Sequence, residues 1–529
     1  MRTTFIIISL VVVLGTLLLT QLWPGAIWLF VIIGPLLVVG FYDMIQKKHA
    51  IRRNFPLIGN FRYILEGIRP EINQYFVESN RDGMPFSRES RSIVYQRAKK
   101  VLDTLPFGTQ QNVYEVGYEW VNHSLKPVHV KPESLRVTIG GPDCKQPYSA
   151  SILNSSAMSY GSLSKNAVMA INWGAKQDNF AQNTGEGGLS EHHLKYGGDI
   201  IWQLGTGYFG ARTHDGNFDP QLFTEKANHP SVKMIEIKLS QGAKPGHGGI
   251  LPAAKVTEEI SRIRHVPMGQ SVISPPGHSA FSTPVEMMQF VKQLRDLSGG
   301  KPVGFKLCVG KRREFLAICK AMIETGITPD YIDVDGGEGG TGAAPLEFSN
   351  NVGSPLSEAL IFVHNSLVGF GLRNKIKIGC SGRIITGFDI IKNISIGADF
   401  CYSARAMMMA VGCIQALRCN SNHCPTGVAT QNKQLMNGLV VEDKAKRVAS
   451  FHEETIESVA EILGAMGLSE TSKLRPWHRM RRTDFTEIHH YGEIYSFLKE
   501  GDLLKDQLPE EYERAMKAAS AASFDYAGA

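Results

Sequence analysis

The chain has 529 residues, of which 43% are hydrophobic and 20% charged, and its formal net charge is +6. This composition predicts that most of the chain folds around a substantial core. No long basic run alternates with aromatic residues, so no nucleic-acid partner is predicted. The 53 glycines indicate many tight turns or close approaches of the backbone to a ligand.

Residues 1–45 are expected to form two membrane-spanning helices. No charged residue occurs from Thr3 to Tyr42, and apolar runs at 5–19 and 26–42 flank the turn sequence TQLWPG. Each run is about as long as a membrane helix requires. A cleaved signal peptide is the alternative, but a second apolar run follows and no small-residue cleavage site is evident. Four basic residues come next, which places the rest of the chain in the cytoplasm by the positive-inside rule: Lys47, Lys48, Arg52 and Arg53.

The middle of the chain has the pattern of a barrel. From about residue 150 to 412, short β-rich runs end in glycine or polar residues and precede helix-like segments. The runs number about one more than eight over roughly 260 residues, the size of a (β/α)8 barrel. Residues 46–130 are interpreted as an irregular, partly helical collar, and residues 436–529 as a helical C-terminal extension. We therefore expect an α/β fold, a TIM barrel with an N-terminal transmembrane hairpin and helical extensions at both ends.

One glycine motif is interpreted as a chance match. GTGYFG, residues 205–210, fits the dinucleotide fingerprint G-x-G-x-x-G after an apolar run. The fingerprint requires a helix to start there, but the turn-rich ARTHDGNFDPQLF follows. A barrel loop is therefore expected.

The last two β-rich runs are followed by a candidate phosphate site. GCSGRIITG (379–387) and YSARAMMMAVG (402–412) would be the loops after strands 7 and 8, where barrels commonly bind phosphate. Gly382 lets the backbone approach closely, and Arg383 and Arg405 add positive charge. A flavin mononucleotide (FMN) phosphate would fit, and the alternative is that these glycines only form turns.

Cationic residues gather in the middle loops. Lys238, Gln241 and Lys244 lie in a predicted strand end and the turn after it, and Arg264 lies on the following helix. Such a cluster suits a dicarboxylate substrate, because Arg can grip one carboxylate in a fork and Lys supplies a point charge. Glu186, flanked by glycines, could handle protons or hold an ammonium-like group. Solvated surface charges are the alternative for each residue.

Three cysteines follow the barrel runs with the spacing C-x5-C-x4-C-P: Cys413, Cys419 and Cys424. Zinc sites favour C-x2-C pairs and four ligands, so zinc is not expected. Iron–sulfur clusters take cysteine thiolates, and bacterial runs end in Cys-Pro. Three cysteines would suit a three-iron cluster, and buried structural cysteines remain the alternative. A four-iron cluster would need a fourth ligand that the spacing does not assign.

Six motifs occur in the order expected of one family: AMSYGSLS, NTGEGG, IKLSQGAKPGHGGILP, ISPPGHS, GGTGAAP and CIQALRCNSNHCPTGVATQ. Over about residues 131–435 the chain resembles the FMN-binding synthase domain of glutamate synthases. The resemblance implies a (β/α)8 barrel that holds FMN beside a [3Fe–4S] cluster, with Cys413, Cys419 and Cys424 as the cluster ligands.

The same resemblance implies roles for individual residues. Glu186 and Lys244 would be catalytic. The 2-oxoglutarate site would contain Lys238, Gln241, Lys244, Arg264 and Ser282. FMN would be contacted by Met158, Ser159, Gly161, Gly382, Arg383, Ser403 and Arg405.

Some positions depart from the family pattern. The chain starts Met1-Arg2, so an N-terminal glutaminase domain with a cysteine nucleophile is not expected. His247 and Ile250 replace a Glu and a Gln, and Glu338 stands where the family usually shows Asp. Ile250 removes a hydrogen-bonding side chain from the expected pocket, and such a loss often accompanies a changed ligand. No long insertion of the ferredoxin-docking kind lies between Gly188 and Gly205.

The leading hypothesis is a membrane-tethered flavin-dependent oxidoreductase that aminates 2-oxoglutarate to glutamate. Ammonia would be free or supplied by a separate glutaminase subunit, and electrons would come from ferredoxin or a reductase subunit through the cluster and FMN. One alternative is an amine-to-glutamate transferase such as N-methylglutamate synthase. Another is a non-catalytic membrane redox relay.

Overall fold

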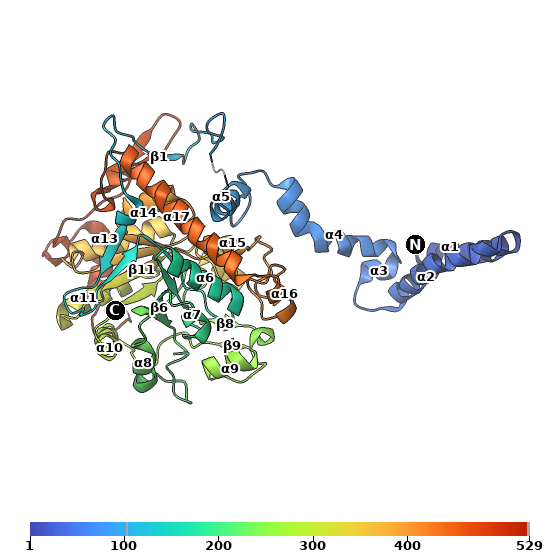
Figure 1. Cartoon of the computed structure of the whole chain (residues 1–529), viewed down its shortest axis with the longest axis horizontal. Coiled ribbons are helices and arrows are strands. Elements are labelled where there is room, and N and C mark those ends of the chain that lie inside the picture. The colour runs from blue at the N-terminus through green and yellow to red at the C-terminus, as the bar shows by residue number, and fades with distance from the viewer. Residues whose placement is uncertain (102–103, 526–529) are drawn as a thin grey trace. The chain divides into compact units, whose positions relative to one another are not determined.

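The computed structural model describes residues 1–101 and 104–525. They divide into two compact units, Met1–Arg88 and Glu89–Ala529 (Figure 1). The boundary falls inside the predicted collar, so residues 46–88 belong with the N-terminal helices and residues 89–130 with the barrel. Residues 102–103 of the predicted collar and 526–529 of the predicted C-terminal extension lie outside the described residues.

The first unit begins with two apolar helices. α1 (Arg2–Leu22) and α2 (Phe30–Ile45) are joined by the 3₁₀ turn η1 (Pro24–Leu29), which starts at the proline of the predicted turn. The rings of Phe5 and Phe41 meet edge to face with centroids 5.4 Å apart, so the two helices are antiparallel. α1, and η1 together with α2 (Pro24–Ile45), are each long and apolar enough to cross a membrane. α3 (Ala50–Asn54), α4 (Ile58–Ile72) and the π-helical turn η2 (Asn73–Val77) follow.

In the second unit eight parallel strands close into a barrel. β13 pairs with β4, for example Tyr402 with Asn154, and this pairing closes the sheet. The predicted TIM barrel is therefore confirmed. In chain order the strands are β4 (Leu153–Ser155), β5 (Ala181–Asn183), β6 (Asp199–Leu204), β7 (Val232–Lys238), β10 (Val303–Leu307), β11 (Tyr331–Asp335), β12 (Lys377–Ser381) and β13 (Phe400–Ser403).

The surplus β-rich run of the sequence is not a barrel strand. The run QSVISPPGHS contains only the two-residue strand β9 (Val272–Ile273), which pairs antiparallel with β8 (Ile250–Leu251). Its two prolines have no N–H to donate to a sheet, which explains why the strand stops after two residues. The β8–β9 pair lies in the long segment between β7 and β10, which also contains η4 (Ala253–Lys255) and α9 (Glu258–Arg264).

Helices form the outer layer of the barrel (Figure 1). Their ends carry local signals: Thr283 and Thr386 begin α10 and α14 with capping boxes, and Gly326, with a φ of 69°, ends α11. The helices are α6 (Lys165–Gln177), α7 (Glu191–Leu194), α8 (Pro220–Ala227), α10 (Pro284–Leu297), α11 (Arg312–Thr325), α12 (Leu346–Asn351), α13 (Leu356–Gly369), α14 (Gly387–Ile394) and α15 (Arg405–Val411).

Segments on either side of the barrel in sequence pack against it. α17 (Val441–Ala465) lies on α6, where a Cβ added to Gly174 would come within 2.7 Å of the Val448 side chain. β1 (Glu119–Val121) forms a small antiparallel sheet with β14 (Arg479–Arg482) and β15 (Ile488–His490). The remaining elements are α5 (Arg88–Ala98), η3 (Pro132–Ser134), α16 (Lys433–Asn437), η5 (Thr471–Lys473), η6 (Pro476–His478), α18 (Tyr491–Ile494), η7 (Asp502–Leu504) and α19 (Glu510–Ala518).

The amino-terminal end of the barrel is closed by an apolar layer. The hairpin β2 (Arg136–Ile139) and β3 (Tyr148–Ser151) contributes to a buried cluster with residues of the strands. Because side chains alternate along a strand, the next inward layer is set two residues further on. That layer is polar and leads up to the carboxyl ends of the strands, where barrels place their sites. The apolar cluster consists of Ile139, Tyr148, Ala150, Ala181, Ile201, Met234, Tyr331, Phe400 and Tyr402.

Candidate active site

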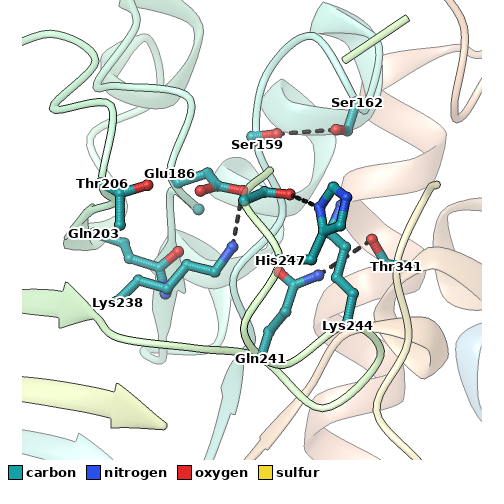
Figure 2. A network of polar contacts seen from close by, with 12 residues as sticks. Ser159, Ser162, Glu186, Gln203, Thr206, Lys238, Gln241, Lys244, His247 and Thr341 are labelled. Atoms are coloured by element: carbon teal, nitrogen blue, oxygen red, sulfur yellow. Dashed lines mark hydrogen bonds and ion pairs between the residues drawn. The ribbon is translucent and has the colours of Figure 1, made fainter. Parts of the chain in front are cut away.

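An ion pair lies at the carboxyl ends of the barrel strands. Lys238 is the last residue of β7, and Glu186 lies in the loop after β5. Lys238 Nζ donates to Glu186 Oε1 over 2.8 Å (Figure 2). Burial alone would raise the pKa of Glu186, but the nearby charges of Lys238, Lys244 and Arg264 outweigh it and lower that pKa. Glu186 is therefore an ionised carboxylate at neutral pH.

The loop after β7 is tied to the loop after β11. Lys244 Nζ donates to the carbonyl of Ala343 over 2.7 Å. Gln241 Nε2 donates to Thr341 Oγ1 over 3.3 Å (Figure 2). Burial, helped by the charge of Lys238, lowers the pKa of Lys244 to about 8. Lys244 is thus poised to gain or lose a proton near neutral pH.

Arg264, at the end of α9, is turned toward the loop after β4. Its Nη2 donates to the carbonyl of Tyr160 over 2.8 Å, and its guanidinium lies 5.1 Å from the ring centroid of Phe209. Burial lowers the pKa of Arg264 to about 10, so it remains a cation. Its Nε is buried and has no hydrogen-bond partner among the described residues. A guanidinium buried in this way is suited to an anionic ligand, which would satisfy the unused donor.

Ser282 is placed differently from the other predicted substrate residues. Its hydroxyl donates to the Glu286 carboxylate over 2.9 Å, next to the capping box that Thr283 and Glu286 form at the start of α10, and the residue is exposed. The structure shows no contact between Ser282 and the Glu186–Lys238 pair among the described residues. A substrate contact by Ser282 stays a prediction.

A hydrogen-bonded chain that the sequence did not predict contacts the backbone carbonyl of Lys238. The N–H of Ala280 donates to the Tyr208 hydroxyl (3.1 Å), which donates to His278 Nδ1 (2.9 Å). His278 Nε2 faces the carbonyl of Lys238 at 2.8 Å and must carry the proton, because a carbonyl only accepts. Burial lowers the pKa of His278 to about 4, so the ring is neutral. The only sequence signal was the motif ISPPGHS, which contains His278.

The predicted phosphate loops lie side by side. Gly382 and Arg383 follow β12 with φ angles of +153° and +51°. Arg405 begins α15, directly after β13, and donates through Nη2 to the carbonyl of Glu338 over 2.6 Å. Burial and the neighbouring charge of Arg383 lower the pKa of Arg405 to about 10. Two guanidinium groups this close repel one another, and a phosphate between them would offset that repulsion, so these residues fit an FMN phosphate.

The predicted flavin contacts after β4 are enclosed by tight loop packing. Met158 is buried, and the Ser159 hydroxyl donates to Ser162 over 3.0 Å (Figure 2). Gly185, with a φ of +64°, packs so closely that an added Cβ would lie 2.6 Å from the Ser159 nitrogen. Gly161 has a φ of +104°, which favours glycine. Ser403, at the end of β13, donates to the carbonyl of Ile384 over 2.7 Å.

The cysteine loop brings its three thiols within electrostatic range of one another. Burial raises the pKa of Cys413 to about 12, and the charges of Cys419 and Cys424 add to this rise. Burial alone would also raise the pKa of Cys424, but the backbone N–H groups of Ala429, Thr426 and Val428 and the Thr426 hydroxyl donate to its sulfur and lower it. All eight cysteines of the chain are free thiols. N–H groups aimed at a cysteine sulfur are typical of iron–sulfur sites, so the loop fits a cluster.

A buried lysine connects this loop to the loops at the carboxyl ends of the barrel strands, which together form the barrel mouth. Lys255 is 2% exposed and donates through Nζ to the carbonyls of Ser162 (3.0 Å) and Ala429 (2.9 Å). Burial lowers its pKa to about 8, against the opposing effect of the thiols of Cys419 and Cys424. Lys255 therefore joins the loop after β4, where flavin contacts are predicted, to the loop that carries the cysteines.

A glycine-rich motif and a cluster of possible metal ligands are both explained by local structure, without a ligand. GTGYFG lies after β6 and is followed by turns until α8, so the expected barrel loop is confirmed. Glu191, His192 and Glu259 place their ligand atoms within 4.8 Å of one another, as a metal site would. Glu259 is already bonded to Tyr160 (2.7 Å) and His192 (2.6 Å), and these contacts account for the group without an ion.

Residues 126–469 match the family described as "Conserved region in glutamate synthase". The chain belongs to the glutamate synthase family. A glutamate synthase large subunit-like protein, YerD, of Bacillus subtilis (strain 168) is 37% identical over 86% of this chain and 94% of its own length. An archaeal glutamate synthase [NADPH] of Methanocaldococcus jannaschii is 35% identical over 68% of this chain and 67% of its own length. The ferredoxin-dependent glutamate synthase of Antithamnion sp. is 35% identical over 46% of this chain and 16% of its own length.

The family match covers the whole barrel and the cysteine loop, and it ends within the C-terminal segment after α17. Among solved structures, a mandelate oxidase variant with (S)-mandelic acid has a TM-score of 0.41 at 14% identity, covering 73% of this chain and 96% of that chain. This likeness is too weak to bear on function.

The glycine of the family motif QGAKPG at position 242 is expected to be irreplaceable. An added Cβ at Gly242 would overlap the carbonyl oxygen of Gly336, and the Gly242 N–H donates to Asp335 over 2.8 Å. Gly242→Ala should therefore destabilise the barrel by about 3 kcal/mol, because backbone atoms on both sides would have to shift. Thermal unfolding in detergent measures this, with Gly310→Ala as the control, since a Cβ there meets nothing within 4 Å. Equal unfolding temperatures for the two variants would contradict the prediction.

Proposed function

We propose that this member of the glutamate synthase family is a flavin-dependent oxidoreductase that aminates 2-oxoglutarate reductively to glutamate. The observation that carries the proposal is the group formed by Glu186, Lys238, Lys244 and Arg264 at the barrel mouth. It combines cations for a dicarboxylate with one ionised carboxylate, inside the segment that matches the family.

The three cations of this group have distinct tasks. Arg264 would hold one carboxylate of the substrate with the Nε–H that has no partner among the described residues. Lys238 and Lys244 would hold the other end and draw electron density from the carbon that accepts nitrogen. Glu186 would hold the incoming ammonium or amine, because its charge is held by the surrounding cations rather than lost to burial.

The reaction needs proton transfer as well as binding. 2-Oxoglutarate, ammonium, two electrons and two protons give glutamate and water. The Lys244 ammonium, with its pKa of about 8, is suited to protonate the oxygen that leaves as water and to be reprotonated from solvent. The chain from Tyr208 through His278 to the Lys238 carbonyl would keep Lys238 in place during this step.

Two cofactors fit the residues present. Gly382, Arg383, Ser403 and Arg405 would hold the FMN phosphate, with Met158, Ser159 and Gly161 beside the ring system. Cys413, Cys419 and Cys424 would ligate a [3Fe–4S] cluster. When bound, the cluster would supply single electrons and FMN a hydride equivalent.

The N-terminal helices bear on where the reaction takes place. α1 and α2 are proposed as a membrane hairpin, with Lys47, Lys48, Arg52 and Arg53 keeping the catalytic unit in the cytoplasm. The electron donor would be a ferredoxin or a reductase subunit. Ammonia would be free or delivered by a glutaminase subunit.

The test uses the purified full chain in detergent with iron, sulfide and flavin counted first. Reduced ferredoxin, ammonia and 2-oxoglutarate should yield glutamate at a rate well above that of a flavin-stripped control. No glutamate above that control would overturn the proposal.

One observation favours a second candidate that uses the same pocket. His247 is half-buried beside Lys244 (Figure 2). Its ring packs against that of Phe348 with centroids 5.5 Å apart. His247 and Ile250 stand where the family pattern has a Glu and a Gln, so the polarity of this loop differs from that pattern. Methylamine replacing ammonia as the better substrate would support an amine-to-glutamate transferase such as N-methylglutamate synthase. Cofactors that titrate reversibly in a protein that binds no keto acid would instead indicate a redox relay.

A further inference from the structure

A second set of charged side chains is enclosed within the barrel, below the mouth. Lys306 of β10, Asp333 and Asp335 of β11 and Glu236 of β7 are all between 0% and 6% exposed. Lys306 Nζ lies 3.3 Å from Asp333 Oδ2 and 3.5 Å from Asp335 Oδ2. None of these residues has a role in the function proposed above.

The charges of this set do not balance if every group is ionised. Three carboxylates face the Lys306 ammonium, and Arg405 is close enough to interact with Asp335. The neutral groups around the set are the hydroxyls of Tyr331 and Tyr402 and the thiols of Cys308 and Cys380, whose pKa values are all raised by burial, and the amides of Asn183 and Gln203. Two more carboxylates lie nearby: Asp330 pairs with Arg295 over 3.0 Å, and Glu338 interacts, as Asp335 does, with Arg405. Lys238, further along β7, is paired with Glu186. Two cations against three carboxylates leave at least one negative charge uncompensated, which is strongly unfavourable in a protein interior.

The hydrogen bonds indicate which carboxyl group is neutral. Asp335 accepts from the Gly242 N–H (2.8 Å) and the Ser381 hydroxyl (2.8 Å) and contacts Lys306, as expected of a carboxylate. Glu236 Oε1 accepts from two neutral amides, Asn183 Nδ2 at 2.8 Å and Gln203 Nε2 at 2.7 Å, and the Tyr331 hydroxyl is a third neutral donor beside this carboxyl group. Its Oε2 is buried and has no hydrogen-bond partner in the part of the chain that the structure describes. Glu236 thus has the weakest support for a negative charge.

We propose that Glu236 is held as a neutral carboxylic acid inside the barrel and shares its proton with Asp333. Burial raises the pKa of Glu236, and it raises the pKa of Asp333 to about 7 despite the charge of Lys306. Two coupled carboxyl groups lose their protons as a pair, so the last proton leaves the pair as the pH rises through about 7. The barrel interior therefore stores a proton two residues below Lys238 on β7.

The stored proton should affect substrate binding at the barrel mouth, an expectation that rests on the proposed function. With Glu236 neutral, the charges of Lys306 and Lys238 add to a field that attracts a dicarboxylate. Loss of the proton would place a negative charge beneath the pocket and weaken binding of 2-oxoglutarate. Between about pH 5.5 and about pH 7.5 we expect the affinity to fall by about tenfold in the wild type and to change little in Glu236→Gln.

Infrared spectroscopy tests the proton directly, in the full chain and without substrate. A protonated carboxyl group has a C=O stretch separate from those of carboxylates and amides. At pH 6 we expect this band in the wild type and in the surface control Glu442→Gln, and its loss in Glu236→Gln. Full chain made by cell-free synthesis with ¹³C-carboxyl glutamate should show the band shifted, which decides the question even if Glu236→Gln does not fold.

The possible outcomes separate this proposal from the proposed function. A missing band at pH 6, or a band unchanged both by the glutamate label and by Glu236→Gln, would overturn the stored proton. A labelled, Glu236-dependent band in a protein that does not bind 2-oxoglutarate would support the stored proton and contradict the proposed function instead. An equal pH dependence of 2-oxoglutarate binding in the wild type and Glu236→Gln would overturn the coupling to the mouth.

Discussion

Replacing Lys238 with methionine should lower kcat/KM for 2-oxoglutarate by about 1,000-fold. The substitution leaves Glu186 buried without its 2.8 Å partner, and such a loss costs about 3–5 kcal/mol. It also removes a cation that the substrate carboxylate would contact. The measurement is steady-state kinetics on protein with an unchanged flavin content.

Lys238→Met should also change how the stability of the folded protein depends on pH. Lys238 is the largest of the charges that lower the pKa of Glu186, so without it burial dominates and that pKa rises. A carboxyl group with a lowered pKa in the folded state adds stability above its unfolded pKa and loses it as pH falls through the folded value. Lys238→Met should therefore lose the stability that the Glu186 carboxylate adds near neutral pH.

A matched control lies on the same strand. Lys233 of β7 is 38% exposed and lies 3.8 Å from Asp199 in a surface ion pair. Lys233→Met removes one lysine from β7 without touching the mouth and should keep activity within about twofold of wild type. Equal losses in the two variants would contradict a specific role for Lys238.

Replacing Cys424 with serine should abolish electron transfer from a protein donor. Cys424 has the thiol whose pKa is lowered by backbone N–H groups, which outweigh its burial, so it is the thiol best prepared to bind iron. We expect loss of iron, sulfide and the cluster's electron paramagnetic resonance signal, with FMN retained. Reduction of the flavin by dithionite should continue, because that reaction does not require the cluster.

Cys319→Ser is the control for this prediction. Cys319 lies on α11, away from the cysteine loop in sequence, and burial alone raises the pKa of its thiol. This variant should keep its iron and its activity. If Cys424→Ser kept a full complement of iron, the assignment of this loop as the cluster site would be wrong.

Much of the architecture could be predicted from local sequence patterns. The two apolar runs were long enough to indicate two helices, and the repeated change from β-rich to helix-like sequence predicted the barrel. One of the nine β-rich runs is not a barrel strand, because QSVISPPGHS has the composition of a strand but two prolines that cannot join a sheet. Side-chain periodicity and proline act over a few residues, which is why such features can be read from the sequence.

Part of the candidate site could be predicted from the sequence. Glu186, Lys238 and Lys244 come together at the mouth, as the positions at strand ends implied, and Arg264 lies within range of Glu186. Ser282 follows from the resemblance alone: its hydroxyl donates to Glu286 at the start of α10, and its contact with substrate stays a prediction. The roles of these residues in binding remain predictions.

By itself the sequence determined the barrel, the N-terminal helices, the order of the site loops and the three-cysteine loop, because each depends on residues close together in the chain. Only the tertiary structure decided that Glu236, Lys306 and Asp333 meet in the interior and that His278 supports Lys238. These residues come from strands and loops that lie far apart in the chain, and no spacing rule connects them. They are brought together by closure of the sheet, which turns alternate side chains of every strand toward one axis.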